Sequence, residues 1–120
     1  MTSAGEMRST AGGRLLREVV VVSSLSELVG PLEGVHRLPL HLDRSAPASY
    51  DFADPQWRSI AYRIILAEAL SQDDLRTWLN SDALVEAWSD LYLPRHVRRA
   101  WEDMHVELAA RGAGPNVPAA

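Results

Sequence analysis

The chain lacks both cysteine and lysine, and each absence restricts what it can be. Without cysteine there can be no disulfide, no thiol nucleophile and no cysteine-bound zinc. All 12 Lys/Arg positions are arginine, whose charge is permanent and whose planar guanidinium can bind a carboxylate or phosphate through two hydrogen bonds. The lack of lysine, together with many Ala, Gly, Pro and Val residues, is typical of a GC-rich coding genome.

Long apolar runs are missing as well. The β-branched run at residues 19–22 is far shorter than the roughly 20 apolar residues of a membrane-spanning helix. The arginines near the N-terminus are not followed by the apolar stretch of a secretory signal. We therefore expect a cytoplasmic protein with no membrane association, and the 47% hydrophobic content is enough for a modest core.

Negative charge is concentrated in the middle of the chain. The net charge is −4, and residues 50–94 carry three arginines and eight acids, whereas residues 95–120 carry four arginines and three acids. A protein built mainly to hold nucleic acid would usually be basic over its largest folded face. The charge distribution therefore favours another protein as the partner over nucleic acid.

Composition divides the chain into a central part and two polar ends. Residues 1–13 and 111–120 are rich in small residues, Gly and Pro, and are predicted to be a disordered arm and a disordered tail. Residues 14–110 are predicted to form a single globular domain of the α+β class, mainly α. Its expected elements are a small N-terminal two-stranded β element and about four helices, at roughly 55–70, 72–79, 82–91 and 94–109.

The β element is predicted from two short segments. Residues 18–23 form a β-branched run typical of a buried strand. Residues 35–42 alternate between apolar and polar side chains, although Pro39 restricts them to an edge or irregular strand. Between the two segments, the leucine spacing predicts a short helix capped by Ser24 and ended by Gly30 and Pro31.

The helix boundaries follow from capping residues. Asp54 followed by Pro55 is typical of a helix start. Ser71 opens the second helix, Asn80 is expected to end it in a left-handed conformation, and Ser81 is expected to cap the third. The first helix carries one broad apolar face, made of Trp57, Ile60, Ala61, Ile64, Ile65 and Ala69.

The four tryptophans and the last helix supply the expected core. Each tryptophan lies in phase with the aliphatic residues of its own helix, which favours a core position. They are Trp57, Trp78, Trp88 and Trp101. In the last helix, the spacing predicts a narrow buried seam made of Val97, Trp101, Met104 and Leu108.

Catalytic and metal-binding patterns are not found. The four histidines have no metal-ligand spacing, no serine lies in a nucleophile elbow, and no glycine-rich loop follows a strand. Asp51 and Asp54 could form a carboxylate pair, but a turn residue and a helix cap explain them better. We expect no enzyme activity, no cofactor, no metal and no catalytic residues.

Three arginines at the start of the last helix are the main candidate for function. Arg95, Arg98 and Arg99 oppose the helix dipole, so they need acidic partners. Two interpretations stay open: an interface in which these arginines bind a partner's carboxylates, or ion pairs within the chain. For the second, Glu102 and Asp103 lie four residues after two of the arginines, and other acids lie on the preceding helix, at Asp82, Glu86 and Asp90. With Trp88 and Tyr92 as apolar contacts, the predicted partner-binding residues are Arg95, Arg98, Arg99, Trp88 and Tyr92.

Three segments form a further pattern: Leu-Pro at 38–39, Tyr-Asp-Phe-Ala-Asp-Pro at 50–55, and Trp88 followed by Leu-Tyr-Leu-Pro-Arg and Arg-Ala-Trp-Glu at 91–102. This pattern resembles a group of small uncharacterised proteins of high-GC bacteria, over roughly residues 35–108. Such proteins are associated with accessory genes, including those beside nucleotidyltransferase-like toxins or small regulators. The resemblance implies a partner protein and brings no activity or catalytic residue.

The sequence thus leaves two functions open. The first is a non-enzymatic protein-binding module, in its most specific form an antitoxin or accessory partner of a toxin-like or regulatory protein. The alternative is a small DNA-associated transcriptional regulator that uses the basic last helix. Helix-turn-helix binding through residues 73–79 and 82–91 is disfavoured, because the second of these helices is acidic. A homodimer is compatible with either function.

Overall fold

The structure is a computed structural model that describes residues 18–44 and 48–111. It is mainly helical with a small two-stranded antiparallel sheet, which confirms the predicted α+β, mainly α class. The predicted arm at 1–13, and all of the predicted tail except Arg111, lie outside the described residues. The helices are α2 (Pro55–Glu68), α3 (Gln72–Trp78), α4 (Ser81–Ala87), α5 (Arg95–Met104) and α6 (Val106–Ala110), with two short 3-10 turns, η1 (Leu25–Glu27) and η2 (Trp88–Asp90).

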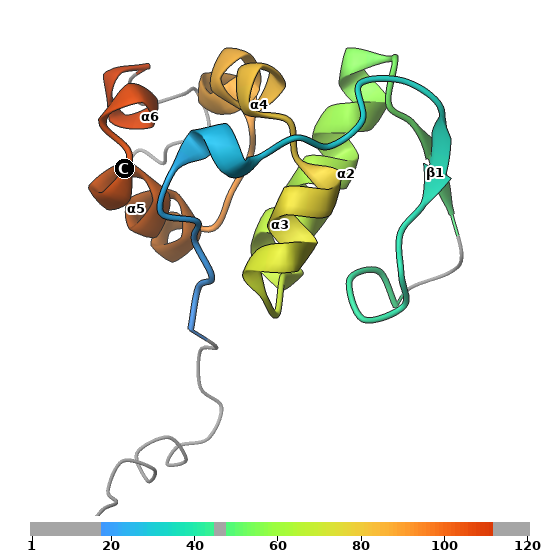
Figure 1. Cartoon of the computed structure of the whole chain (residues 1–120), viewed down its shortest axis with the longest axis horizontal. Coiled ribbons are helices and arrows are strands. Elements are labelled where there is room, and N and C mark those ends of the chain that lie inside the picture. The colour runs from blue at the N-terminus through green and yellow to red at the C-terminus, as the bar shows by residue number, and fades with distance from the viewer. Residues whose placement is uncertain (1–17, 45–47, 112–120) are drawn as a thin grey trace, which may run out of the picture.

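The elements form three groups in space. Helices α2 and α3 lie side by side at the centre, with α4, α5 and α6 on one side and the sheet on the other (Figure 1). The sheet consists of β1 (Val35–Arg37) and β2 (Ser49–Asp51). The segment that carries η1 runs across the front of the helices in Figure 1 and joins the two outer groups.

The N-terminal strand prediction was wrong. Residues 18–23 form no strand, and their backbone bonds to helix side chains instead. Gln72 donates to the carbonyl of Val21 at 3.0 Å, and the ring Nε2 of His105 lies 2.8 Å from the carbonyl of Val22. β-branched residues favour extended backbone, but only tertiary contacts decide whether another strand lies beside them.

The second predicted strand is shorter than expected and has a different partner. β1 pairs antiparallel with β2, and Val35 lies opposite Asp51. Pro39 ends the strand region, because its carbonyl accepts the turn hydrogen bonds of Leu42 and Asp43, at 2.9 and 3.0 Å. The sheet is therefore local to residues 35–51, and β2 was not predicted.

Three helix starts were predicted correctly, and one cap was misplaced. Asp54 accepts the Gln56 N–H at 2.9 Å and caps α2. Ser71 caps α3, and Ser24 forms a capping box, although only the 3-10 turn η1 follows it rather than a longer helix. Asn80 is extended, with φ −111°, and its side chain caps α4. The prediction of a left-handed Asn80 and a Ser81 cap was wrong.

The last two predicted helices are interrupted. The helix expected at 82–91 passes from α4 into η2 at Trp88, and the helix expected at 94–109 breaks at His105. His105 is extended, with φ −126°, and buried, because its ring bonds to the backbone of Val22. Of the predicted seam, Val97, Trp101 and Leu108 are buried, whereas Met104, the last residue of α5, is 56% exposed.

Gly30 marks the closest approach between the η1 segment and the helices. Its N–H donates to the carbonyl of Leu79 at 2.8 Å, and the Ser81 N–H donates to the carbonyl of Leu28 at 3.0 Å. A Cβ atom at Gly30 would lie 2.5 Å from the carbonyl carbon of Trp78. Only glycine lets the two backbones come this close.

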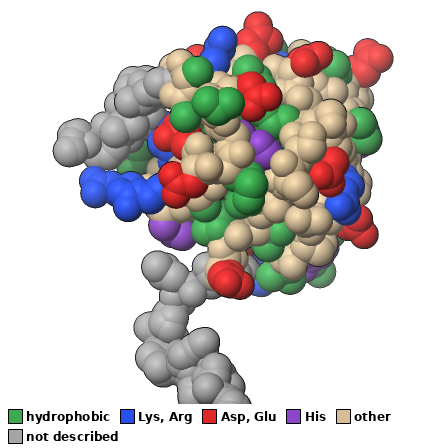
Figure 2. Space-filling model, turned by 60° about the vertical axis from the view of Figure 1, so that its left-hand side comes forward, with side chains coloured by type: hydrophobic (Ala, Val, Ile, Leu, Met, Phe, Trp, Pro, Cys, Tyr) green, Lys and Arg blue, Asp and Glu red, His purple; other side chains and the backbone are tan. Residues whose placement is uncertain are grey.

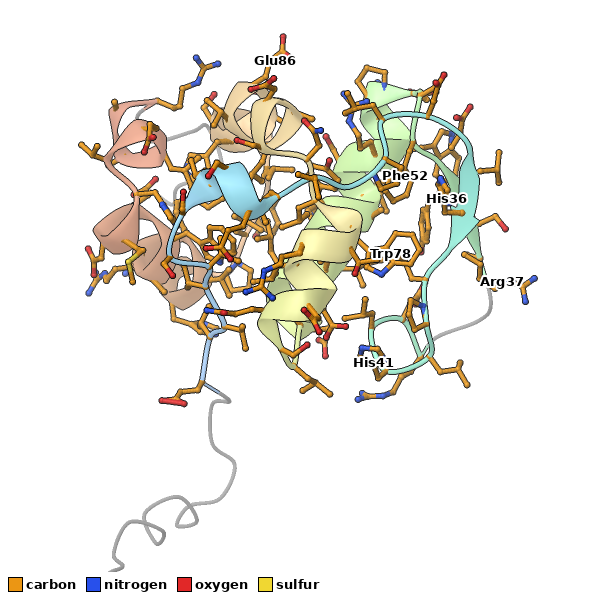
Figure 3. The ribbon with its side chains drawn as sticks, in the orientation of Figure 1. His36, Arg37, His41, Phe52, Trp78 and Glu86 are labelled. Carbon is orange, nitrogen blue, oxygen red and sulfur yellow. The ribbon has the colours of Figure 1, made fainter. Side chains whose placement is uncertain are left out.

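The core contains two of the four tryptophans. Trp88 and Trp101 are fully buried, as predicted, and their rings lie 6.4 Å apart. Trp78 is partly buried against His36, whose ring also contacts Phe52 edge to face (Figure 3). Trp57 is 48% exposed, so its predicted core position was wrong.

Candidate functional site

A groove with an apolar floor runs between α2 and the start of α5. It encloses about 850 Å³ and is bordered by α2, by residues 42–44 after β1, and by the segment that joins η2 to α5. Its apolar side chains are Leu42, Ile60, Ile64, Ala67, Leu93 and Pro94, with Tyr92 beside them. A hollow of this size and composition is typical of a binding surface.

The α2 wall of the groove exists because this helix is apolar on two sides. One side is buried in the core and contains Ala61, Tyr62, Ile65 and Leu66. The other faces the groove, where Ile60 is 37% exposed and Ile64 is partly buried. Trp57 lies one turn before Ile60 and packs beside Tyr50, with ring centroids 6.3 Å apart. The single broad apolar face predicted for this helix is therefore two faces.

Three exposed arginines surround the apolar floor: Arg44, Arg63 and Arg95. The guanidinium of Arg63 lies over the ring of Tyr92, 5.7 Å from its centre, and Tyr92 itself is 64% exposed. Among the described residues, no carboxylate lies within 4.0 Å of any of these three arginines. Their charges therefore face the groove mouth and solvent.

Arg98 lies at the inner end of the groove and is engaged within the chain. It is only 7% exposed, and it donates to the carbonyl oxygens of Leu91 and Trp88. Its guanidinium lies 3.6 Å from Glu102, which confirms the predicted pairing four residues apart. Glu102 also accepts the indole N–H of Trp88 at 2.9 Å. Arg98 thus joins α5 to the end of η2.

The other predicted partner-binding residues are dispersed. Trp88 is fully buried and is not accessible to a partner. Arg99 is exposed but does not line the groove, and within the described residues it forms no ion pair with Asp103. The structure brings together Arg95, Tyr92 and Arg98 from the predicted set. The alternative left open, ion pairs between these arginines and the acids of α4 and η2, is not seen in the part of the chain described.

Glu68, which is partly buried, is one of two acidic residues that line the groove. Asp43 is the other. It is 7% exposed and accepts the hydroxyl of Tyr50 at 2.7 Å. Burial of Tyr50 and this bond to a carboxylate raise the pKa of the tyrosine to about 12, because both disfavour the phenolate. At neutral pH, Tyr50 is therefore a fixed hydrogen-bond donor that orients Asp43.

Sequence reasoning missed Arg44, Arg63, Ile60 and Ile64 as site residues. Arg63 lies between Ile60 and Ile64 on the same side of α2. An arginine within an apolar stripe of a helix could have identified it from the sequence as a site residue. Arg44 had no signal, because its place beside α2 depends on how the turn after β1 folds back.

The histidines have local roles. His41 bonds to Asp74 at 2.8 Å, and His36 bonds to the carbonyl of Glu33 at 2.9 Å. Within residues 18–44 and 48–111, no group of three His, Asp or Glu side chains is placed to hold a metal ion.

No protein-family model matches this sequence, and no curated protein or solved structure matches it either. No described helix has both the length and the apolar character needed to cross a membrane. The groove geometry is therefore the basis for a functional proposal.

Proposed function

We propose that this chain is a non-enzymatic protein-binding module and that the groove between α2 and α5 is its binding surface. The observation that carries the proposal is the combination of an apolar floor with three exposed arginines, Arg44, Arg63 and Arg95. In its most specific form, the partner is a toxin-like or regulatory protein that this chain accompanies or neutralises.

The chemistry of the groove favours a partner that carries carboxylates. Arginine forms charge-assisted, two-pronged hydrogen bonds to carboxylates, and it is enriched at protein interfaces together with aromatic residues. Tyr92 lines the groove, and Trp57 lies one turn before the groove residue Ile60; both are exposed and supply apolar area. Figure 2 shows another face, the left-hand side of Figure 1, on which acidic and basic groups are both scattered among apolar and other atoms.

The alternative, a DNA-associated regulator acting through α5, is supported less well. Only Arg95 and Arg99 of the three arginines on this helix are exposed, since Arg98 is buried against backbone carbonyls. Two exposed arginines can contact few phosphates of a DNA backbone. Asp103, which is exposed on the same helix, would repel that backbone.

Site-specific photo-crosslinking in the native cells tests the proposal. The full chain carries p-benzoylphenylalanine in place of Ile60 in the groove or, as a matched control, in place of the exposed Val106 on α6. We expect a partner protein to crosslink from position 60 and not from position 106. We also expect Arg63→Glu with Arg95→Glu to abolish the crosslink, whereas Arg37→Glu on β1, which is exposed and does not line the groove, leaves it unchanged (Figure 3).

Two outcomes would contradict the proposal. One is a protein partner that the chain retains undiminished when both groove arginines are reversed. The other is duplex DNA binding that weakens steeply with salt and is lost in Arg95→Ala with Arg99→Ala, which would assign the chain to the DNA-associated class.

A further inference from the structure

We infer that the segment bound in the groove is an acidic amphipathic α-helix of the partner, lying alongside α2. This inference rests on the proposed function, because it takes the groove as the binding surface. It adds the conformation and the charge of the occupant.

The two apolar sides of α2 carry the first step. A helix that is apolar around most of its circumference is normally packed on both sides. The core covers one side of α2, while Trp57 and Ile60 remain exposed on the other. Among residues 18–44 and 48–111, no element covers this side of α2, which leaves a place for an additional packed element.

The spacing of the exposed stripe indicates a helix as that element. Trp57, Ile60, Ile64 and Ala67 follow one another at three or four residues, which forms a ridge along α2. Ridges of this kind pack into the grooves of a neighbouring helix. With 14 residues, α2 is about 21 Å long, which matches three to four turns of a bound helix.

The opposite wall disfavours an extended peptide. It is formed by Leu93 and Pro94, and proline has no N–H with which to continue a ladder of backbone hydrogen bonds. Binding by strand addition needs such an edge, whereas a helix in a groove needs only side-chain contacts.

Charge indicates an acidic helix and disfavours a second copy bound through the same face. Four arginines and two acids line the groove, so its charge is positive overall. Asp43 is buried and bonded to Tyr50, and Glu68 is partly buried, whereas Arg44, Arg63 and Arg95 are exposed, so a bound helix would meet mainly cations. Symmetrical pairing of two copies through this groove would bring both sets of arginines together, and like charges at close range cost free energy. Glutamate residues that flank an apolar stripe would pair with all three arginines.

The test uses designed peptides and the full chain. The acidic peptide has four helical turns, with leucine at positions i, i+3, i+7 and i+10 and glutamate on both flanks. One control replaces each glutamate with lysine, and a second permutes the acidic sequence so that composition is kept and the helical stripe is lost. Affinity is measured by titration calorimetry. Burial of Trp57 is measured by protection from acrylamide quenching in a Trp78→Phe background, because Trp78 is only partly buried whereas Trp88 and Trp101 are fully buried.

We expect the acidic peptide to bind at least about tenfold more tightly than either control, a difference of about 1.4 kcal/mol. Reversal of the groove charges by Arg63→Glu with Arg95→Glu should transfer the preference to the lysine peptide. The matched control is Arg99→Glu on α5, the helix that carries Arg95, since Arg99 lies outside the groove. This variant should keep the preference for the acidic peptide. Circular dichroism of each variant checks that the fold is retained.

Several outcomes would overturn the inference. Equal binding of the permuted peptide would exclude a helical occupant, and equal binding of the lysine peptide would exclude the role of charge. Dimerisation of the free chain that is abolished by Ile60→Glu but not by Val106→Glu would assign the groove to a second copy. A crosslink from position 60 to other residues of the same chain would assign the groove to an intramolecular contact.

If the native partner crosslinks at position 60 while the acidic peptide fails to bind, the binding function stands and the helical occupant is wrong.

Discussion

The guanidinium of Arg98 lies over the indole ring of Trp88, 5.1 Å from its centre, and donates to the carbonyl of the same residue. A side chain from the first turns of α5 therefore holds the end of η2 in place. This contact fixes the connection between these elements, and with it the Tyr92–Arg95 side of the groove. The arginine cluster thus combines a structural residue, Arg98, with an exposed one at the groove, Arg95.

Truncation of Arg98 is expected to destabilise the fold strongly. Arg98→Met keeps much of the apolar stem but removes the guanidinium donor to the carbonyls of Leu91 and Trp88 and leaves Glu102 without its cation. The Trp88 carbonyl keeps only the N–H of Leu91. Losses of this kind cost about 2–4 kcal/mol, whereas Arg99→Met at an exposed position should change stability by no more than about 0.5 kcal/mol. Urea denaturation of the two variants measures the difference. Equal unfolding free energies would show that Arg98 is not a structural residue.

A methyl group at residue 30 is expected to separate the η1 segment from the helices. In Gly30→Ala the new Cβ would meet backbone atoms of Trp78 and Leu79, which cannot rotate away as a side chain can. Overpacking of this kind costs about 1–3 kcal/mol. Amide hydrogen exchange of Ser81, whose N–H donates to Leu28, should accelerate in this variant. The neighbouring Val29→Ala, at a 74% exposed position, is the control and should leave that exchange rate unchanged.

Tyr50 is expected to make stability fall at alkaline pH. Its pKa is raised from 10.0 to about 12 by burial and by the bond to Asp43, so the folded state favours the neutral phenol. This contribution is fully present below the unfolded pKa of 10.0 and is lost as pH rises through the folded pKa of about 12. Tyr50→Phe should therefore show a shallower decline of stability between these pH values. It should also lose one high-pH step in the ultraviolet titration of tyrosinate, and retention of that step would contradict the assignment.

Asp74 is expected to contribute stability that is lost in acid. Partial burial alone would raise the pKa of this carboxyl, but the backbone N–H of Leu70 and the ring of His41 together lower it below its usual value of 3.8. The contribution is therefore present above the unfolded pKa and disappears as pH falls through the lower folded pKa. Asp74→Asn should destabilise the chain at neutral pH and reduce the dependence of stability on pH below about 4. Thermal unfolding across this range measures both effects, and parallel curves for the two proteins would rule out this role.

Helix starts could be predicted because their causes are local. Asp54, Ser71 and Ser24 cap the elements that follow them through bonds to N–H groups two or three residues away. The same local logic failed at Asn80, since both Asn80 and Ser81 are good caps, and the contact of this segment with residues 28–30 decides between them. The mainly helical class followed from these caps and from apolar periodicity.

The candidate site could be predicted only in part. Arg95 and Tyr92 were identified from the chain, because charge and aromatic character next to a helix start are visible in the sequence. Trp57 and Ile60 were expected in the core, because a periodic pattern shows that a side is apolar but not whether a neighbour covers it. Arg98 shares with the exposed Arg99 an acid four residues later, and only its position over Trp88 distinguishes a buried structural arginine from an exposed one.

The positions of the main helices, the caps at Ser24, Asp54 and Ser71, and the lack of cysteine chemistry thus belong to the chain itself, since they depend on composition or on residues a few positions apart. The pairing of β1 with β2, the break at His105 and the groove depend on contacts between residues far apart in the sequence. His105 breaks its helix because its ring bonds to Val22, 83 residues earlier. No local pattern encodes such a contact, because its free energy arises only when the packed core brings the two segments together.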